Sequence, residues 1–355
     1  MRMIITAGGT GGHIMPAVAI AGAVRELSPG TRILFVGTDR GMEERIAGLY
    51  DLDFQAIHAL GIKGKSPLQA VRAAATNTTA LLKALKIVRS FRPDWVVGTG
   101  GYITGMVVLA GYLQGAACAI QEQNSIPGLT NRLLSRFASR IFLAFPDTRG
   151  AFPQRKSVVS GNPVRADIIR GKKAGRGQSL LILGGSLGAA SINEAAVKAL
   201  NILKQEGLVP DVIHQCGPRD YDRVVRTYRD MGLPAEVHAF IDDMTPVYNR
   251  ASMAICRCGG LTLAELSAMA IPAIMIPYPH AADDHQTANA RYVESHGGGW
   301  IIPDRELSAQ RLADEIKARL FESGTLEKAA AGIAGLGLGQ GSQFIAQEIL
   351  RCSGA

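Results

Sequence analysis

Long hydrophobic runs are missing from this 355-residue sequence, because no apolar stretch reaches the roughly 18 to 20 residues that a membrane-spanning helix needs. The first residues, MRMIITAGG, predict a buried strand that runs into a glycine turn, and they lack the apolar stretch and cleavage site of a signal peptide. Cysteines number only five, at irregular spacing, which predicts reduced thiols and no disulfide framework. These absences favour a cytoplasmic protein.

Acidic residues are absent between Asp53 and Asp94, although this stretch holds seven bases. They are Lys63, Lys65, Arg72, Lys83, Lys86, Arg89 and Arg92. Residues 1–162 carry 18 Lys and Arg against 9 Asp and Glu, so the basic excess lies wholly in the first half. Such a region attracts phosphate, nucleic acid or an anionic membrane. Nucleic acid is disfavoured, because no aromatic residues interleave with the bases and no helix-turn-helix pattern is present.

Short apolar runs alternate with helical patterns, which is typical of parallel sheets joined by right-handed crossovers. The expected strands are 3–7, 32–36, 95–98, 116–120 and 141–144, then 179–183, 212–214, 237–239, 253–255 and 273–276. The helices expected after three of the glycine-rich turns lie near 16–27, 189–204 and 262–270. Both halves open alike, with MIITAGGTGGH and SLLILGGSLGA. We therefore expect an α/β protein with two doubly wound domains, 1–162 and 163–340. The segment 341–355 looks helical, but its packing does not follow from the sequence.

Glycine is abundant, with 41 residues, and it gathers in loops that follow strands, at 8–12 and 184–188. Exposed backbone N–H groups and the positive end of the next helix suit a phosphate or diphosphate there. The dinucleotide fingerprint fails because its third glycine would fall on Ile14, and a Walker A motif fails because its first glycine would fall on Ala59. An NAD enzyme and a P-loop NTPase are therefore disfavoured.

Several polar side chains follow the predicted strands. His13 directly follows the first glycine loop, near the expected start of the first helix, where a neutral imidazole can accept a proton or orient a substrate. Arg165 offers a planar fork of donors to a diphosphate, and Glu265 can act at a helix N-terminus or accept hydrogen bonds from ribose hydroxyls. The turn at 283–289 predicts sugar contacts and is only weak evidence for a metal. Cys256 and Cys258 are interpreted as plain buried cysteines, because no further ligands lie at metal-site spacing.

Eight ordered motifs resemble those of the MurG family of glycosyltransferases, in glycosyltransferase family 28. They are GGTGGHIMPA at 8–17, GTGGYITG at 98–105, QEQNSIPGLTN at 121–131, SGNPVR at 160–165, GGSLGA at 184–189, FIDDM at 240–244, GGLTLAE at 259–265 and PHAADDHQTANA at 279–290. The resemblance implies the GT-B fold, with two facing Rossmann-like domains and the active site in the cleft between them. It also implies an inverting transfer of GlcNAc from UDP-GlcNAc to the 4-hydroxyl of MurNAc in lipid I, the undecaprenyl-diphosphate-linked acceptor, which gives lipid II.

The same resemblance implies roles for individual residues. His13, Tyr102 and Glu122 fall where the acceptor hydroxyl should enter, with His13 the first choice for general base and Glu122 the second. The residues implied in UDP-GlcNAc binding are Thr10, Gly11, Gly12, Asn124, Arg165, Ser186, Ile241, Gly260, Leu261, Thr262, Leu263, Ala264, Glu265, Gln286 and Asn289. Among them, the backbone at Ile241 should meet the uracil, Glu265 the ribose, and Gln286 and Asn289 the GlcNAc hydroxyls.

Three positions depart from the family pattern: Gln121 stands where His is usual, Leu187 where Gln is usual, and Cys258 where Ser or Ala is common. No D-x-D motif is present to hold a metal. We therefore expect no tightly bound cofactor and no requirement for a divalent metal.

The basic stretch predicts a peripheral protein on the cytoplasmic face of the inner membrane, held weakly by anionic lipids. Other cell-wall or division proteins are further candidate partners. Three alternatives remain open: another GT-B transferase acting on a lipid, a UDP-GlcNAc 2-epimerase, and a catalytically silent sugar-nucleotide-binding protein.

Overall fold

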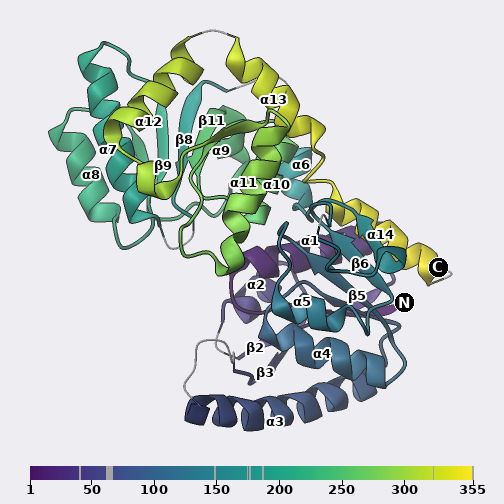
Figure 1. The fold of residues 1–355 in the computed structure, drawn as a ribbon. Coiled ribbons are helices and arrows are strands. Elements are labelled where there is room, and N and C mark those ends of the chain that lie inside the picture. The colour runs from purple at the N-terminus through teal and green to yellow at the C-terminus, as the bar shows by residue number, and fades with distance from the viewer. Residues whose placement is uncertain are drawn as a thin grey trace. The chain divides into compact units, whose positions relative to one another are not determined.

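The structure is a computed structural model that describes residues 1–39, 41–60, 67–147, 149–173, 175, 177–185, 188–322 and 324–353. The chain divides into two compact units (Figure 1). Unit 1 comprises Met1–Ala166 and Gly339–Ala355, and unit 2 comprises Asp167–Leu338. The expected boundaries, 162/163 and 340/341, differ from this division by a few residues. Arg165 thus belongs to unit 1, although the sequence placed it in the second domain.

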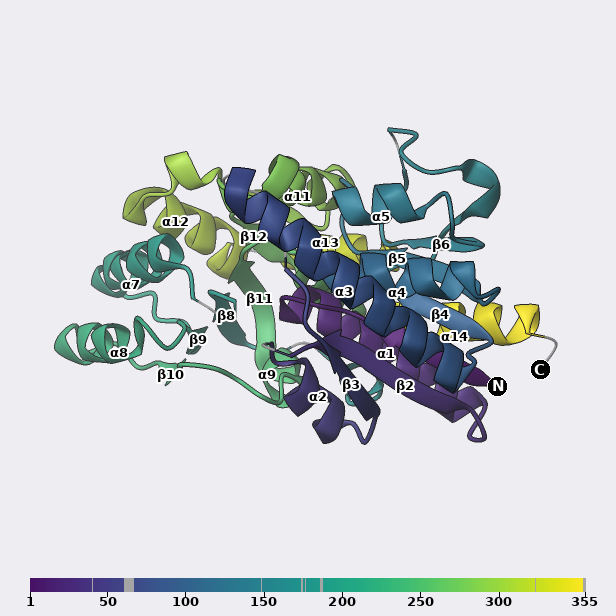
Figure 2. The same ribbon diagram turned by 90° about the horizontal axis from the view of Figure 1, so that it is seen from below.

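Unit 1 is built on a parallel sheet with the strand order β3-β2-β1-β4-β5-β6-β7. Its strands are β1 (Arg2–Thr6), β2 (Arg32–Thr38), β3 (Asp53–Ile57), β4 (Trp95–Gly98), β5 (Ala117–Glu122), β6 (Arg140–Leu143) and β7 (Ser157–Val159). Its helices are α1 (Gly11–Leu27), α2 (Glu43–Leu49), α3 (Pro67–Phe91), α4 (Tyr102–Leu113), α5 (Leu129–Leu134) and α14 (Gly341–Cys352). In Figures 1 and 2 this sheet lies between helices on both faces.

Two cores cover the two faces of this sheet, because successive side chains of a strand point to opposite sides. Met3 and Ile5 of β1 pack with α1, α2 and α14, whereas Ile4 packs with α3 and α4. Burial on both faces explains why these strands are continuous apolar runs, from which the sequence predicted β1, β2, β4, β5 and β6. The sequence missed β3 and β7 at the sheet edges, where DFQAI and SVV are only partly buried.

Helix α1 begins earlier than expected. The sequence placed its start near Pro16, after a glycine-rich turn. The helix instead begins at Gly11, so that Pro16 lies inside it. Proline has no N–H, so the Gly12 carbonyl loses its usual intrahelical donor. The earlier start brings His13 into the first turn of the helix.

Unit 2 repeats the architecture, with the strand order β10-β9-β8-β11-β12-β13 and all pairs parallel. Its strands are β8 (Ser179–Leu183), β9 (Val212–Gln215), β10 (Glu236–His238), β11 (Ala251–Cys256), β12 (Ala273–Met275) and β13 (Gly299–Ile301). Its longer helices are α7 (Ala190–Gln205), α8 (Tyr221–Asp230), α10 (Gly260–Met269), α11 (His285–Ser295), α12 (Ala309–Ile316) and α13 (Thr325–Gly335), and the shorter α6 (Ala166–Arg170) and α9 (Thr245–Arg250) complete the set. Two Rossmann-like sheets are therefore present, as the repeated opening motif predicted.

The C-terminal helix α14 packs on α1 of unit 1. Ile345, Ala346 and Ile349 are buried in the same core as the α1 side chains. Trp95 Nε1 donates to Ser353 Oγ at 2.9 Å, just beyond the helix. Among the described residues, no helix is long and apolar enough to cross a membrane.

Candidate functional site

In unit 1, the loops after the neighbouring strands β1, β4 and β5 meet at the carboxyl edge of the sheet, where open α/β sheets bind ligands. Gly8 N donates to Gly100 O at 3.2 Å and joins the first two loops. A Cβ on Gly101 would lie 2.2 Å from Gly8 O, and one on Gly100 would lie 2.5 Å from His13 Nδ1. Only glycine permits this close approach, since both residues also have positive φ.

The His13 ring is half-buried at this edge, and its Nδ1 lies 2.9 Å from Gln123 Oε1. The His13 carbonyl accepts a hydrogen bond from Thr99 Oγ1 at 2.8 Å. The loop after β5 thus contacts the His13 side chain, and the loop after β4 contacts its backbone. The sequence predicted His13 at this position but did not predict its partner Gln123.

Behind His13 lies a cluster of buried amide side chains. Its members are Gln121, Gln123, Asn131 and Asn162, each at most 4% exposed. Gln121 Nε2 donates to Asn162 Oδ1 at 2.9 Å, and Asn162 Nδ2 donates to Gln123 O at 3.1 Å. Gln121 therefore has a structural role here, in the position where the family usually has His.

Glu122 is only 3% exposed, and its carboxylate accepts three hydrogen bonds. The donors are Asn124 N at 3.1 Å, Gly128 N at 3.1 Å and Asn131 Nδ2 at 2.9 Å. These bonds tie the loop after β5 to the start of α5. Glu122 is therefore placed to organise this loop, which weakens its case as a general base.

The other residues predicted in unit 1 are spread along the same edge. Gly11 is half-buried and Thr10 and Gly12 are exposed at the N-terminal end of α1, and Tyr102 is 36% exposed at the start of α4. Asn124 is half-buried in the β5 loop. The Arg165 guanidinium donates from Nη1 to the Tyr50 hydroxyl at 2.9 Å.

The first glycine loop offers fewer N–H groups than its sequence suggested. Gly9 N donates at 3.2 Å to Glu43 Oε1, which also accepts from Thr38 Oγ1 at 2.9 Å. Glu43 is fully buried, and neither it nor this contact was predicted. Because Gly8 N is bonded to Gly100 O as well, an anion at this loop would bind mainly at the start of α1.

In unit 2, the second glycine loop follows β8, and Ser186 and Leu187 within it lie outside the described residues. Gln215 at the end of β9 links this loop to the Ile241 backbone. Its Nε2 donates to Gly185 O and its Oε1 accepts from Ile241 N, both at 3.1 Å. A nucleobase that binds the Ile241 N–H would have to replace Gln215, which the sequence did not predict.

Helix α10 begins at Gly260, two residues before the predicted start at Thr262. Glu265 therefore lies in its second turn and not its first, and its Oε2 accepts a 2.7 Å hydrogen bond from the Tyr248 hydroxyl. Leu263 and Ala264 have fully buried side chains, so only their backbone could contact a ligand. Leu261 and Thr262 are half-buried at the first turn.

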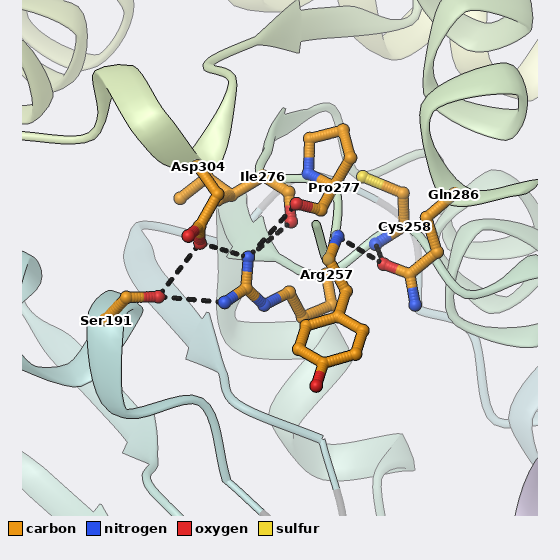
Figure 3. Close-up of polar contacts among 8 residues, drawn as sticks. Ser191, Arg257, Cys258, Ile276, Pro277, Gln286 and Asp304 are labelled. Carbon is orange, nitrogen blue, oxygen red and sulfur yellow. Dashed lines mark hydrogen bonds and ion pairs between the residues drawn. The ribbon is translucent and has the colours of Figure 1, made fainter. Parts of the chain in front are cut away.

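Gln286 near the start of α11 has a fixed amide orientation (Figure 3). Its Oε1 accepts from both Cys258 N and Tyr278 N at 3.0 Å, so its Nε2 points away from these loops. Asn289, one turn later, is fully buried and donates to Cys258 O at 3.0 Å. Gln286 thus presents a donor at the carboxyl edge, whereas Asn289 holds the loop after β11 from beneath.

Arg257 joins three segments behind Gln286 (Figure 3). It forms a 2.6 Å ion pair with Asp304 and donates to Ser191 Oγ at 2.8 Å and to the Ile276 carbonyl at 3.2 Å. Both charged side chains are about four-fifths buried. The sequence did not single out Arg257, because its partners come from distant parts of the chain.

Cys256 and Cys258 are fully buried, which confirms their interpretation as plain core cysteines. Burial raises the pKa of the Cys256 thiol to about 12 and raises that of Cys258 as well. All five cysteines are unpaired. No cluster of potential metal ligands occurs in the described part of the chain.

Comparison with solved structures places the whole chain in one fold class. MurG from Acinetobacter baumannii matches with a TM-score of 0.80 at 30% sequence identity, covering 99% of each chain. A UDP-GlcNAc 2-epimerase from Neisseria meningitidis matches with a TM-score of 0.68 at 15% identity, covering 99% of this chain and 100% of that one. The two Rossmann-like units thus define a protein of the GT-B fold, as predicted.

Sequence comparison identifies the family within this fold. Residues 3–143 match the glycosyltransferase family 28 N-terminal domain, and residues 179–342 match the C-terminal domain. A protein from Syntrophus aciditrophicus is 43% identical over 95% of this chain and 94% of its own length. It is named UDP-N-acetylglucosamine--N-acetylmuramyl-(pentapeptide) pyrophosphoryl-undecaprenol N-acetylglucosamine transferase. A protein from Geotalea uraniireducens with the same name is 39% identical over 99% of this chain and 98% of its own length. The chain belongs to glycosyltransferase family 28, which confirms the resemblance, and it is a glycosyltransferase.

Proposed function

We propose that this enzyme transfers GlcNAc from UDP-GlcNAc to the 4-hydroxyl of MurNAc in lipid I and so forms lipid II for peptidoglycan synthesis. The observation that carries the proposal is the similarity to transferases named for this activity, because it extends over both units. The 2-epimerase alternative is supported by the fold alone, at 15% identity.

The chemistry is a single in-line displacement at the anomeric carbon. The acceptor oxygen forms a bond to C1 while the C1–O bond to UDP breaks. The electron pair of the broken bond leaves with the diphosphate. The hydroxyl proton must pass to a base, and the α-linked donor then gives a β-linked product. No glycosyl-enzyme intermediate is needed, as in inverting glycosidases.

His13 is the general base in this proposal. Its ring is half-buried at the edge where three loops meet, and it is bonded only to a neutral amide at Nδ1 among the described residues. Glu122 is less suited, because three donors already engage its carboxylate and the acceptor hydroxyl would have to compete with them. Tyr102, exposed at the start of α4, is assigned to acceptor positioning.

The leaving diphosphate is assigned to the second glycine loop with the start of α7, and to Arg165. Backbone N–H groups and a helix dipole stabilise growing negative charge without reorganising. On the donor side, Gln286 Nε2 is assigned to the GlcNAc hydroxyls and the Glu265 carboxylate to the ribose. Asn289, buried beneath them, supports the loop and makes no direct sugar contact in this account.

Catalysis is proposed to need no tightly bound cofactor and no divalent metal, because N–H groups and a guanidinium can stabilise the diphosphate charge. Retained turnover after exhaustive chelation would support this, and complete loss that only a divalent ion restores would contradict it.

The enzyme is further proposed to dock peripherally on the cytoplasmic face of the inner membrane through α3. Lys83, Lys86, Arg89 and Arg92 are exposed along and just beyond this helix, and Leu82 beside them is 62% exposed. Ala84, Ile87 and Val88 of the same helix are buried in the core of unit 1, so the exposed bases lie away from that core. Lys63 and Lys65 lie outside the described residues, as does the side chain of Arg72.

The proposed reaction is tested by incubating the enzyme with radiolabelled UDP-GlcNAc and a lipid I analogue. Label should move into the lipid fraction. Label that stays in the aqueous phase as an epimerised nucleotide sugar would instead identify a 2-epimerase.

A further inference from the structure

Gln123 is the only described side chain that is hydrogen-bonded to the His13 ring, and the orientation of its amide group can be deduced. The side chain is 2% exposed. Its Nε2 faces two backbone carbonyls, to which it donates: Thr99 O, at short range, and Gln121 O at 3.2 Å. A carbonyl oxygen can only accept a hydrogen bond, so the opposite amide orientation would set oxygen against oxygen.

The remaining amide atom, Oε1, is therefore the one that lies 2.9 Å from His13 Nδ1. An amide oxygen also can only accept, so Nδ1 must carry the ring proton. In the neutral imidazole, Nε2 is then unprotonated and can accept a proton from a hydroxyl.

We propose that Gln123 is a positioning residue that holds His13 in the tautomer with its proton on Nδ1. The inference deepens the proposed function and rests on it for the catalytic consequence, because only a base at Nε2 needs this tautomer. Without an acceptor at Nδ1, the ring could carry its proton on either nitrogen and could rotate.

Other groups of the buried cluster fix Gln123 in turn. Asn162 Nδ2 donates to the Gln123 backbone carbonyl at 3.1 Å, and Gln121 Nε2 donates to Asn162 Oδ1 at 2.9 Å. Hydrogen bonds among the four buried amides thus hold Gln123, and through it the His13 ring, in one arrangement. Burying an amide side chain costs free energy of desolvation that an apolar side chain would not. Orientation of His13 explains why so many amides are nevertheless buried next to a single imidazole.

The direct test is the nitrogen NMR spectrum of enzyme labelled with ¹⁵N-histidine. The chain has 7 histidines, so the His13 signals are assigned as those that disappear in His13→Gln. We expect Nδ1 of His13 to be protonated and Nε2 to be unprotonated near neutral pH. A neutral ring with its proton on Nε2 would overturn the proposal, whether or not the enzyme transfers GlcNAc. Failure of the tautomer proposal can therefore be distinguished from failure of the proposed transferase function.

Variants separate positioning from general support of the fold. Gln123→Met keeps the side-chain length but removes Oε1, so we expect a mixed tautomer and a fall in kcat on the order of tenfold to a hundredfold with little change in KM. Asn77→Leu is the matched control, because it removes a buried amide of unit 1 that bonds to the Leu60 backbone and to neither His13 nor Gln123, so it should leave the tautomer unchanged. Equal tautomer spectra for Gln123→Met and the native enzyme would contradict the proposal.

Discussion

At the scale of single residues, the two base candidates differ in what surrounds them. His13 has a neutral amide at one nitrogen, whereas the Glu122 carboxylate is engaged by three donors. We expect His13→Ala to lower kcat by about 10²- to 10⁴-fold while the affinity for UDP-GlcNAc stays the same, because general-base catalysis typically contributes this much. Steady-state kinetics and nucleotide titration calorimetry measure both quantities.

Glu122→Gln is the companion variant. An amide nitrogen in place of one carboxylate oxygen would oppose the backbone N–H groups of the loop, so turnover and melting temperature should fall together. If Glu122→Gln abolished turnover at unchanged melting temperature while His13→Ala remained active, Glu122 would be the base.

His214 in β9 gives a prediction about pH. It is fully buried between the Tyr228 hydroxyl at 3.0 Å and Asn193 Oδ1 at 3.1 Å, and burial lowers its pKa from 6.5 to about 3. Between these values the unfolded chain binds a proton that the folded chain does not, so stability falls as pH falls from about 6.5 toward 3. Within this range, His214 contributes a slope of up to about 1.4 kcal/mol per pH unit to the free energy of unfolding.

His214→Gln keeps polar atoms between both partners and removes the titration. The difference in free energy of unfolding between the native enzyme and this variant, measured by urea titration from pH 7 to pH 4.5, should therefore shrink as pH falls. A difference that does not change with pH would show that burial of His214 does not oppose its protonation.

The site shows which contacts a sequence can predict and which it cannot. His13 follows a glycine loop and a strand, so its place at the sheet edge follows from local order. Its partner Gln123 depends on the adjacency of β1, β4 and β5, which no local pattern encodes. Arg257 and Asp304 likewise meet only because the fold brings together the segments after β11 and β13, between which β12 lies in the sheet.

At the scale of elements, apolar runs predicted the central strands, because burial on both faces demands continuous hydrophobic sequence. The edge strand β3 alternates polar and apolar residues and was missed. The start of α1 was placed too late, near Pro16, because the glycines before it were interpreted as a turn, whereas the helix begins at Gly11.

Helix α14 gives a prediction of its own, because it completes the core of unit 1. Ile345→Ala should lower the free energy of unfolding by about 2–4 kcal/mol through the cavity it leaves. Gln347→Ala, on the exposed side of the same helix, is the control and should have an effect within about 0.5 kcal/mol. Equal, small effects in a urea titration would mean that α14 does not contribute to this core.

Helix α3 carries the proposed membrane contact. Reversing the charge of Lys83, Lys86, Arg89 and Arg92 to Glu should weaken binding to vesicles rich in phosphatidylglycerol by at least about tenfold, since each base near an anionic surface contributes about 1 kcal/mol. The control reverses four exposed bases of unit 2, namely Arg219, Arg226, Arg229 and Arg305. Sedimentation with vesicles at low salt compares the two; equal losses would indicate a general charge effect and no specific role for α3.

At the scale of the whole molecule, the repeated opening motif predicted two similar α/β sheets, and the structure and the family comparisons agree. The sequence could not place the C-terminal helix, because an amphipathic segment shows that it packs but not on which partner. It also could not foresee that Glu43 would take a donor from the first glycine loop.

The account of the whole enzyme depends on a transfer that inverts the anomeric carbon of GlcNAc. The most direct measurement is the NMR spectrum of the lipid-linked product made from UDP-GlcNAc and a lipid I analogue, with a chelator present. We predict GlcNAc attached to the MurNAc 4-hydroxyl in the β configuration. An α linkage, a different acceptor position, or free UDP-ManNAc as the only product would contradict the account.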